Sequence, residues 1–352
     1  MKKQLVVLFG GHSSEYEVSL VSAYAVLTNT DTEKYDILPV GITKDGLWLA
    51  YTGDYADIPT NKWCENPDSL PRVTVDLTPN AQSFLLRAKD GTTLSRLRAD
   101  VVFPVLHGAY GEDGAVQGLL ELAGIPFVGC GHASSAVCMD KTFTKRIIAA
   151  LGLKQADYVV ALRTDDTEAV IAEAEKVCGY PMFVKPARAG SSVGVSKAKD
   201  AEQLRRALEI AFREDEKIMI EETIVGMEIE TAVLQEGDRY TVADVAEILA
   251  GAEFYDYDAK YNSTESSYCL PARLPKEIRD EVRARAEKIF RTLDCRTLAR
   301  VDFFCRPSGE IVFNEINTLP GFTPISMYPK LLMALGMSYA ELIDRLLCSA
   351  ME

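Results

Sequence analysis

The sequence predicts an α/β protein of more than one domain, and three observations lead to this prediction. The chain opens with a strand–helix–strand pattern, apolar strands alternate with helices through its middle, and a two-stranded hairpin lies near its end. At 352 residues the chain is long enough for two or three domains.

The N-terminal third has the pattern of a parallel sheet, in which strands buried on both faces form continuous apolar runs. Residues 45–98 are weakly patterned and carry both tryptophans, so we expect an irregular insertion with a small hairpin there. The elements expected around it are strands at 4–9, 35–41 and 101–106 and helices at 18–27 and 116–123.

The rest of the chain continues to alternate between strands and helices. A polar and aromatic loop is expected over 252–269, and residues 299–306 and 310–315 flank Pro-Ser-Gly as an antiparallel hairpin. The remaining expected elements are strands at 180–185, 217–221, 228–234 and 240–248 and helices at 141–151, 202–211, 276–293 and from 339.

Composition and charge exclude several classes of function. The net charge is −14, and an acidic chain is poorly suited to a nucleic-acid backbone, which needs a basic surface. No apolar run reaches the length of a membrane span, so we expect no membrane partner. The eight scattered cysteines form no CxxC pair, which favours reduced thiols in a cytoplasmic protein and makes a zinc site improbable.

The C-terminal hairpin carries the strongest chemical signal. Side chains two residues apart on a strand share a face, so Arg300 lies beside Asp302 and Glu315 lies beside Asn317. If the two faces coincide across the hairpin, three oxygen ligands converge, and oxygen ligands suit magnesium. The alternative is an ordinary solvated face of an edge hairpin.

A loop of small residues gives a second signal. Lys185 ends a strand and is followed by Pro-Ala-Arg-Ala-Gly-Ser-Ser-Val-Gly, in which Ser191, Ser192 and the backbone N–H groups can cover phosphate oxygens. The alternative is a flexible hairpin. Lys141, at the start of a helix, is a second candidate phosphate partner, although alone it would be a surface lysine.

A third, weaker signal follows the strand at 217–221. Glu221 and Ile224 lie where the strand meets a turn and could offer an edge to a base, and Glu228 could bind a ribose. The alternative is a solvated charge run.

Taken together, these residues resemble the D-alanine–D-alanine ligases, a family of the ATP-grasp superfamily. The similarity covers nearly the whole chain and is weakest over 45–98. It rests on motifs that occur in the order of the family: LFGGHSSEYEVS, LHGAYGEDGAVQG, MDKTFTK, VKPARAGSSVGVSK, FYDYDAKY, RVDFF and NEINTLPGFTPISMYP.

The resemblance implies an ATP-grasp fold of three α/β domains, with the nucleotide site between the central and C-terminal domains. The first domain would have a parallel sheet, and the last would carry a lid at 252–269. A homodimer in the cytoplasm is implied as well. The implied domains are 1–129, with the 45–98 insertion, then 130–221 and 222–352.

The resemblance also implies the ligands and the residues that bind them. ATP would be bound by Lys141, Lys185, Ser192, Glu221, Ile224, Glu228 and Lys260. Two magnesium ions, with manganese as an alternative, would be held by Asp302, Glu315 and Asn317. The groups around the two D-alanines would be Glu15, His107, Ser191, Tyr261, Arg300, Gly321, Ser326 and Met327.

In the implied reaction, ATP phosphorylates the carboxylate of the first D-alanine, and the amine of the second attacks the acyl phosphate. Arg300 and the Gly321 N–H would stabilise the oxyanion. Two positions differ from some members, Glu222 in place of a lysine and Ala189 in place of a glutamate. The alternatives are a D-Ala–D-Ser or D-Ala–D-lactate ligase and, more distantly, a phosphotransferase or nucleotide-binding regulator on the same fold.

Overall fold

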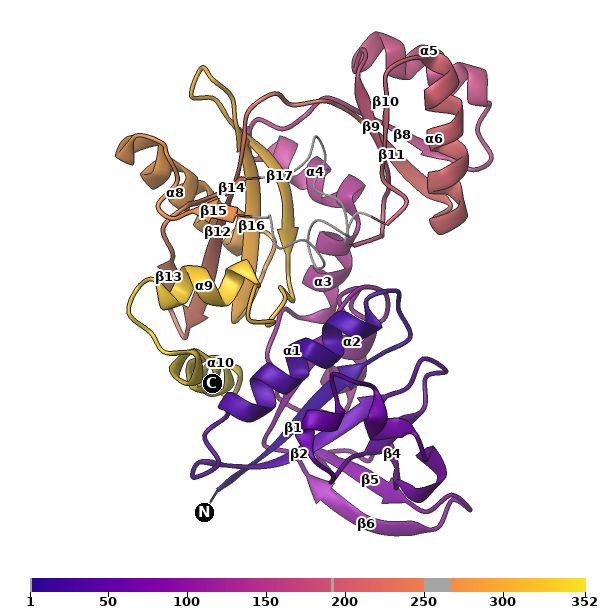
Figure 1. The fold of residues 1–352 in the computed structure, drawn as a ribbon, viewed down its shortest axis with the longest axis vertical. Helices are drawn as coiled ribbons and strands as arrows, with labels where there is room; N and C mark the ends of the chain where they lie inside the picture. Colours follow the sequence, from indigo (N-terminus) through magenta and orange to yellow (C-terminus); the bar gives the residue numbers. More distant parts are fainter. Residues whose placement is uncertain (1, 191–192, 250–266) are drawn as a thin grey trace.

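The protein is described here from a computed structural model that covers residues 2–190, 193–249 and 267–352. Three β-sheets follow one another along the chain, and helices cover them (Figure 1). The four-stranded sheet with α5 and α6 lies at one end of the molecule, and the seven-stranded sheet lies at the opposite end. The α/β prediction is therefore confirmed.

The N-terminal sheet has the order β6-β5-β4-β3-β2-β1-β7, in which β1 pairs in parallel with β2 and β7. Leu5–Phe9 are fully buried, because helices and the neighbouring strands cover this run. The strands are β1 (Lys3–Gly10), β2 (Tyr35–Ile42), β3 (Trp48–Ala50), β4 (Arg72–Asp76), β5 (Ser83–Arg87), β6 (Thr93–Arg98) and β7 (Val101–Leu106). The helices are α1 (Tyr16–Asn29) and α2 (Ala115–Leu122).

The prediction for residues 45–98 was right about a hairpin, which β5 and β6 form, but it missed β3 and β4, and the domain has a mixed sheet. Strands β3 to β6 extend the sheet in antiparallel fashion beyond β2, with three short 3-10 helices between β3 and β4. The sequence does not mark these strands clearly because β3 to β5 are only three to five residues long and β6, at the edge of the sheet, has no buried residue. A strand exposed on both faces needs no apolar alternation.

The central sheet is antiparallel in the order β10-β9-β11-β8, and α5 and α6 pack against it. Asp166 and Asp200 cap the two helices through their first backbone N–H groups. The strands are β8 (Tyr158–Leu162), β9 (Met182–Pro186), β10 (Ser196–Ala198) and β11 (Lys217–Glu222). The helices of this part are α3 (His132–Met139), α4 (Lys141–Ala150), α5 (Thr167–Val177) and α6 (Ala201–Glu214).

The C-terminal sheet has the order β15-β14-β12-β16-β17, with β13 paired to β12. The single strand predicted at 240–248 was wrong, because 243–245 break it into β13 and β14. The strands are β12 (Met227–Glu236), β13 (Arg239–Val242), β14 (Ala246–Leu249), β15 (Ser267–Cys269), β16 (Leu298–Cys305) and β17 (Ile311–Asn317). The helices are α8 (Lys276–Thr292), α9 (Met327–Met333) and α10 (Tyr339–Ala350).

The last helix joins the two ends of the chain into one core. Apolar side chains of α10 pack together with those of α1, β1 and β12. Lys34 also forms an ion pair with Asp344 at 2.7 Å. Because this core links the N-terminal and C-terminal sheets, it fixes their positions relative to each other. The predicted domain boundaries themselves stay predictions.

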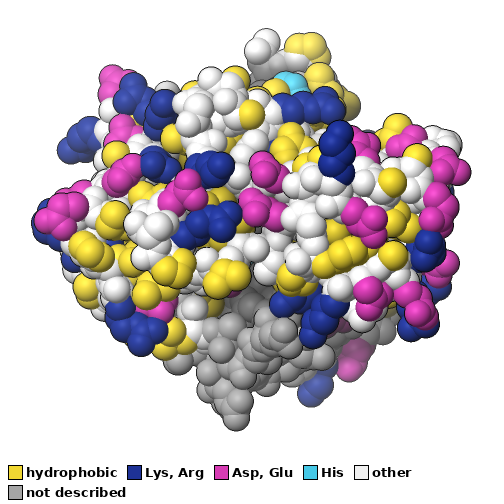
Figure 2. All heavy atoms as spheres, turned by 90° about the horizontal axis from the view of Figure 1, so that it is seen from above, with side chains coloured by type: hydrophobic (Ala, Val, Ile, Leu, Met, Phe, Trp, Pro, Cys, Tyr) yellow, Lys and Arg dark blue, Asp and Glu magenta, His cyan; other side chains and the backbone are white. Residues whose placement is uncertain are grey.

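The surface gives no strong charge pattern on the face shown in Figure 2, where Lys and Arg are interspersed with Asp and Glu. None of the described helices is long and apolar enough to span a bilayer. All eight cysteines lie in the described part of the chain and are free thiols, as the sequence predicts.

Candidate active site

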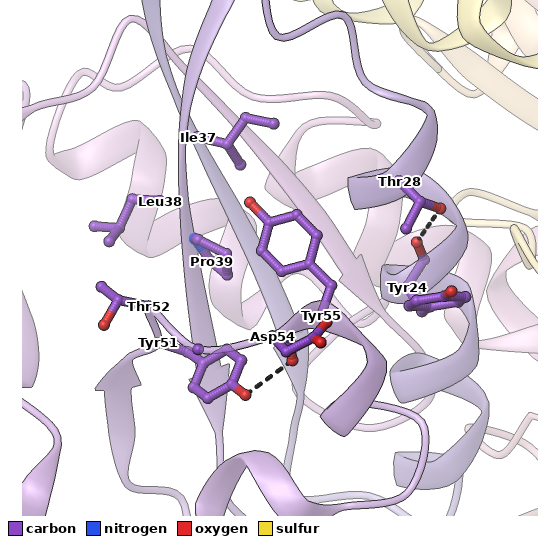
Figure 3. A pocket seen from close by; sticks show the side chains of 10 residues that line it. Tyr24, Thr28, Ile37, Leu38, Pro39, Tyr51, Thr52, Asp54 and Tyr55 are labelled. Atoms are coloured by element: carbon purple, nitrogen blue, oxygen red, sulfur yellow. Dashed lines mark hydrogen bonds between the residues drawn. The ribbon is translucent and has the colours of Figure 1, made fainter.

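One cavity is lined by residues from all three parts of the chain. Its volume is about 490 Å³, and Glu15, Lys185 and Arg300 line it from the N-terminal, central and C-terminal parts in turn. Another cavity, of about 530 Å³, lies between α1 and the segment after β3 and is lined by Tyr24, Tyr51 and other residues (Figure 3). No Lys or Arg lines that cavity among the described residues, so the inter-sheet cavity is the better candidate for a phosphate ligand.

The predicted convergence of the C-terminal hairpin is confirmed. Asp302 on β16 lies directly opposite Glu315 on β17, and Arg300 lies opposite Asn317. Directly opposed residues of antiparallel strands share a face. The Asn317 Nδ2 donates to Asp302 Oδ2 at 3.3 Å. Glu230 on β12 lies opposite Asp302 and extends this acidic face to a third strand.

Arg300 is held as a fixed cation at the edge of the acidic face. Its Nε and Nη2 donate to the two Asp302 oxygens at 2.9 and 2.7 Å, and its Nε lies 3.1 Å from Glu230 Oε2. Burial would lower the pKa of the guanidinium, but Asp302 and Glu230 raise the pKa well above its ordinary value. The cation is therefore preorganised before any substrate charge develops.

Two lysines share one buried carboxylate beneath the cavity. Glu221 Oε1 lies 2.5 Å from Lys145 Nζ, and Glu221 Oε2 lies 2.6 Å from Lys185 Nζ. Lys145 is almost fully buried, whereas Lys185 lines the cavity. Burial would lower the pKa of Lys185, but Glu221, Glu315 and Glu228 raise it, so the ammonium stays charged.

The Glu221 carboxylate should make folding stability depend on pH in a defined window. Burial raises its pKa, but Lys145 and Lys185 outweigh burial and lower the pKa from 4.5 to about 2. A carboxyl group whose pKa is lower in the folded state than in the unfolded state stabilises the protein at pH values above the unfolded-state pKa. This contribution disappears as the pH falls through the folded-state pKa. The shift corresponds to about 3 kcal/mol.

We therefore expect Glu221→Gln to lower the free energy of unfolding by an amount that is constant from about pH 5 to 8 and shrinks below about pH 4.5. Urea unfolding of both proteins across this range measures the difference. A difference that did not shrink at low pH would mean that the two lysines do not hold Glu221 ionised.

The N-terminal part of the cavity holds a cluster of buried acid and imidazole groups. Ser22 Oγ lies 3.1 Å from His107 Nε2, and Glu112 Oε1 lies 3.5 Å from His107 Nδ1. Burial would lower the pKa of His107, but Glu112 and Glu15 raise it above its ordinary value. Burial and the Glu15 charge also raise the pKa of Glu112. Glu15 and Glu112 place two carboxyl groups in this part of the cavity, of which Glu15 is the predicted partner of an ammonium group.

Glycines allow two loops to approach the Glu15 carboxylate. A Cβ built on Gly108 would lie 2.6 Å from Glu15 Oε2, and one built on Gly190 would lie 2.8 Å from the same atom. Gly108 also has φ +72°, a conformation that favours glycine. Glu15 is thus enclosed by the N-terminal domain on one side and by the loop after β9 on the other.

The loop before α9 brings the last predicted substrate residues together. A Cβ built on Gly321 would lie 2.7 Å from Ser326 Oγ, so the two residues are in direct contact. Thr323 N donates to Ser326 Oγ at 3.0 Å. Met327 is the first residue of α9 and lines the cavity beside Ser326. The backbone of this loop and the two side chains therefore face the same space.

The lining of the cavity is rich in carboxylates, although no group of three or more His, Cys, Asp or Glu side chains within residues 2–190, 193–249 and 267–352 is placed to hold a metal ion. Among the described residues its carboxylates are Glu15, Glu112, Glu221, Glu222, Glu228, Glu230 and Glu315, and its cations are Lys141, Lys185, Lys197 and Arg300. A triphosphate would be repelled by this excess of acid unless additional cations neutralised it. Carboxylate and amide oxygens are hard ligands of the kind that magnesium prefers.

Four predicted residues lie outside the described part of the chain, namely Ser191, Ser192, Lys260 and Tyr261, as does most of the predicted lid at 252–269. Sequence reasoning missed Lys145, Glu112 and Glu230. Lys145 could have been found because it follows Lys141 by four residues on α4, which puts both on one helix face. Glu230 likewise shares its strand face with Glu228.

Comparison with known proteins agrees with this geometry over the whole chain. The family described as D-ala D-ala ligase N-terminus matches residues 4–130, and D-ala D-ala ligase C-terminus matches residues 147–348. The chain is 48% identical to the D-alanine–D-alanine ligase of Acetivibrio thermocellus and 46% identical to that of Caldicellulosiruptor bescii. Each match covers 100% of this chain and 96% of the relative.

Solved structures of ligases have the same fold. The VanG D-Ala:D-Ser ligase from Enterococcus faecalis superimposes with a TM-score of 0.90 at 42% identity, covering 99% of this chain and 100% of that one. The D-alanine–D-alanine ligase from Coxiella burnetii gives a TM-score of 0.84 at 34% identity, covering 99% and 94%. The chain therefore belongs to the D-alanine–D-alanine ligase family of ATP-dependent ligases.

Proposed function

We propose that the protein joins two molecules of D-alanine into D-alanyl-D-alanine with ATP as the energy source, for peptidoglycan precursor synthesis. The observation that carries the proposal is a single cavity whose lining brings together Lys141, Lys185, Glu315, Arg300 and Glu15. These groups would serve as phosphate partners, a metal ligand, a fixed cation and an ammonium partner. A phosphotransferase would not need the last two features beside its phosphate lysines.

ATP binds between the central and C-terminal sheets. Lys141 and Lys185 meet the phosphates, and Glu228 takes the ribose hydroxyls. Glu221 and Ile224 line the adenine site, at the end of β11 and just beyond it, and the Glu221 side chain also pairs with two lysines. Ser192 and Lys260 are expected to add contacts from segments that lie outside the described residues.

The first step transfers the γ-phosphoryl group to the carboxylate of the first D-alanine, whose ammonium Glu15 binds with His107 beside it. Phosphoryl transfer needs positioning and cations around the spread negative charge rather than covalent help from the protein. Magnesium ions held by Asp302, Glu315 and Asn317 would supply further positive charge there. Two ions and the possible use of manganese stay predictions.

In the second step the amine of the second D-alanine attacks the acyl phosphate. Ser326 binds the carboxylate of this D-alanine, which orients the amine. Negative charge develops on the carbonyl oxygen of the attacked carbon until inorganic phosphate leaves, and fixed donors stabilise such charge most effectively. Arg300 is one donor, and the Gly321 N–H is the other. Ser191 and Tyr261 are predicted to hydrogen-bond near the first D-alanine, and a homodimer is predicted from the resemblance.

A coupled assay tests the proposal directly. Release of ADP should depend on D-alanine, and each ADP should be matched by one D-alanyl-D-alanine in the product mixture. L-alanine serves as the control substrate and should leave ADP release at background. ADP formation that is independent of D-alanine would instead favour a phosphotransferase or a nucleotide-binding regulator on this fold.

Met327 provides the prediction for the choice of second substrate. Its apolar side chain beside Ser326 suits a methyl group, whereas an arginine there could reach a hydroxyl-bearing substrate. An apolar wall rejects an added hydroxyl by only about 1–3 kcal/mol, or roughly 5- to 150-fold. We expect D-alanine to be preferred over D-serine within this range and Met327→Arg to shift the ratio towards D-serine or D-lactate.

The matched control for this prediction is Met333→Arg. Met333 lies on the same helix, is 41% exposed and does not line the cavity. Product ratios for both variants and the wild type, measured by mass spectrometry, give the comparison. An unchanged ratio in Met327→Arg, or an equal change in Met333→Arg, would remove Met327 from the specificity pocket.

A further inference from the structure

The segment 187–190, which we call the loop base, leads from β9 into the predicted phosphate-covering loop. Its backbone is attached on two sides. Lys141 N donates to Ala187 O at 3.0 Å, and Lys141 Nζ donates to Ala189 O at 2.8 Å. On the other side Ala187 N donates to Lys217 O at 2.9 Å. The loop base is thus tied to the start of α4 and to the start of β11.

Arg188 strengthens the second attachment through a forked ion pair. Its Nη2 donates to Asp215 Oδ1 at 2.5 Å, and its Nε donates to Oδ2 at 3.2 Å. The backbone N–H of Arg188 also donates to Oδ2, at 2.9 Å. Asp215 is buried, and burial by itself raises the pKa of its carboxyl group. Arg188 makes the largest opposing contribution, so that the pKa stays below its ordinary value. A bidentate pair with one buried partner fixes direction as well as distance.

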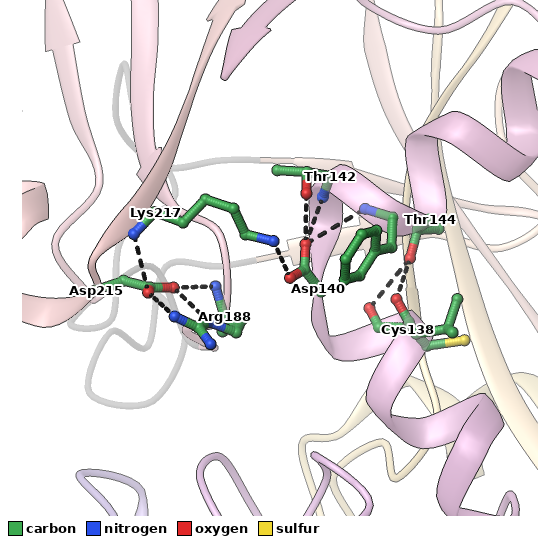
Figure 4. A network of polar contacts seen from close by, with 9 residues as sticks. Cys138, Asp140, Thr142, Thr144, Arg188, Asp215 and Lys217 are labelled. Atoms are coloured by element: carbon green, nitrogen blue, oxygen red, sulfur yellow. Dashed lines mark hydrogen bonds and ion pairs between the residues drawn. The ribbon is translucent and has the colours of Figure 1, made fainter. Parts of the chain in front are cut away.

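The same network continues to the helix that carries Lys141 (Figure 4). Lys217 donates its backbone N–H to Asp215 Oδ1 at 3.1 Å, and its Nζ pairs with Asp140 Oδ2. Asp140 in turn caps α4 by accepting from Thr142 N at 3.0 Å. A continuous chain of contacts therefore runs from Arg188 through Asp215, Lys217 and Asp140 to the first turn of α4.

Residues next to each end of this network of contacts line the cavity, whereas the side chains of the network itself do not. Lys141, Ala189 and Gly190 line the cavity, and Gly190 packs against the Glu15 carboxylate. Within the described residues, Arg188, Asp215, Lys217 and Asp140 are absent from the lining. A shift of the loop base would therefore move a phosphate cation and the wall of the ammonium site together.

We propose that Arg188 and Asp215 are a positioning pair, which holds the loop base and Lys141 in the arrangement that binds the ATP phosphates. The inference rests on the proposed function for its catalytic consequence but not for its effect on nucleotide binding. Arg188 touches neither substrate in this account and acts through the backbone of residues 187–190.

Arg188→Gln tests the proposal, because it removes the fork while leaving the backbone N–H bond to Asp215. A hydrogen bond to a charged group is typically worth enough to change binding about tenfold. We expect the dissociation constant of ATP, measured by calorimetry without D-alanine, and the KM for ATP to rise about tenfold, with a smaller change in kcat. Arg188→Lys keeps the charge without the forked ion pair, so its dissociation constant and KM for ATP should lie between those of Arg188→Gln and the wild type.

Arg205→Gln is the matched control. Arg205 makes a fork to Glu168 at 2.8 and 2.7 Å between α6 and α5, in the same part of the chain but away from the cavity. Arg205→Gln should leave the dissociation constant and the KM for ATP within about twofold of the wild-type values, as expected for an exposed ion pair. Thermal midpoints of all variants report loss of stability separately.

Each outcome decides the inference. Weaker ATP binding in Arg188→Gln but not in Arg205→Gln supports it. Equal ATP binding in Arg188→Gln and the wild type overturns it, as does a lowered thermal midpoint with unchanged ATP binding, since the pair would then be structural only. If the wild type binds ATP without forming a D-alanyl dipeptide, the proposed function fails, and the calorimetric comparison still decides the role of the pair.

Discussion

Replacing Glu315 by glutamine is expected to abolish ATP turnover while leaving the fold intact. Glu315 lies opposite Asp302 in the hairpin and 3.8 Å from Lys141, between the acidic face and the phosphate cations. Glutamine keeps the shape but removes a charged oxygen ligand. The loss of charge stabilisation should be several kcal/mol, which lowers kcat by about 10³-fold or more.

Two further measurements make the Glu315 prediction specific. The affinity for Mn²⁺, measured by proton relaxation without turnover, should fall in Glu315→Gln. Glu310→Gln is the control, because Glu310 is exposed, precedes β17, forms an ion pair with Arg306 and does not line the cavity. Wild-type turnover with an unchanged magnesium dependence in Glu315→Gln would exclude Glu315 from the metal site.

Lys185→Ala is expected to have the second largest effect, a loss of about 10²- to 10³-fold in kcat, the range seen when a preorganised charge-stabilising donor is removed. The ammonium lies at the cavity wall and is kept charged by Glu221. The fold should survive, because Lys145 remains to neutralise the buried Glu221 carboxylate. This separates a catalytic loss from unfolding.

The control for Lys185 is Lys199→Ala, which removes an exposed lysine just after β10. Rapid-quench measurement of ADP formation in a single turnover reports the phosphoryl-transfer step itself. If Lys185→Ala forms ADP at the wild-type rate in that experiment, Lys185 does not contact the transferring phosphate.

Local pattern predicted the chemistry of the C-terminal hairpin well. Strand parity placed Arg300 beside Asp302 and Glu315 beside Asn317, and the antiparallel register brought the two pairs together. The sequence could not supply the third strand of the acidic face, because Glu230 joins it only through the pairing of β12 with β16, some 70 residues away.

Long-range contacts explain the rest of what the sequence left open. Glu221 was predicted to line the adenine site, and its two ion pairs depend on Lys145 of α4 and Lys185 of β9 lying beside β11. The attachment of Arg188 to Asp215 was equally hidden, since 27 residues separate them. Strands β3 and β4 were missed because they are short, and the edge strand β6 lacks the apolar alternation that marks a half-buried strand.

The measurement that most directly tests the central claim is the identity of the product when D-alanine, D-serine and D-lactate compete at equal concentration near neutral pH. Because Met327 gives the second-substrate site an apolar wall, we expect mostly D-alanyl-D-alanine, a minor share of D-alanyl-D-serine and little D-alanyl-D-lactate, with one ADP for each product molecule. A product that is mostly D-alanyl-D-serine, the reaction named for the structurally similar VanG ligase, would contradict this expectation.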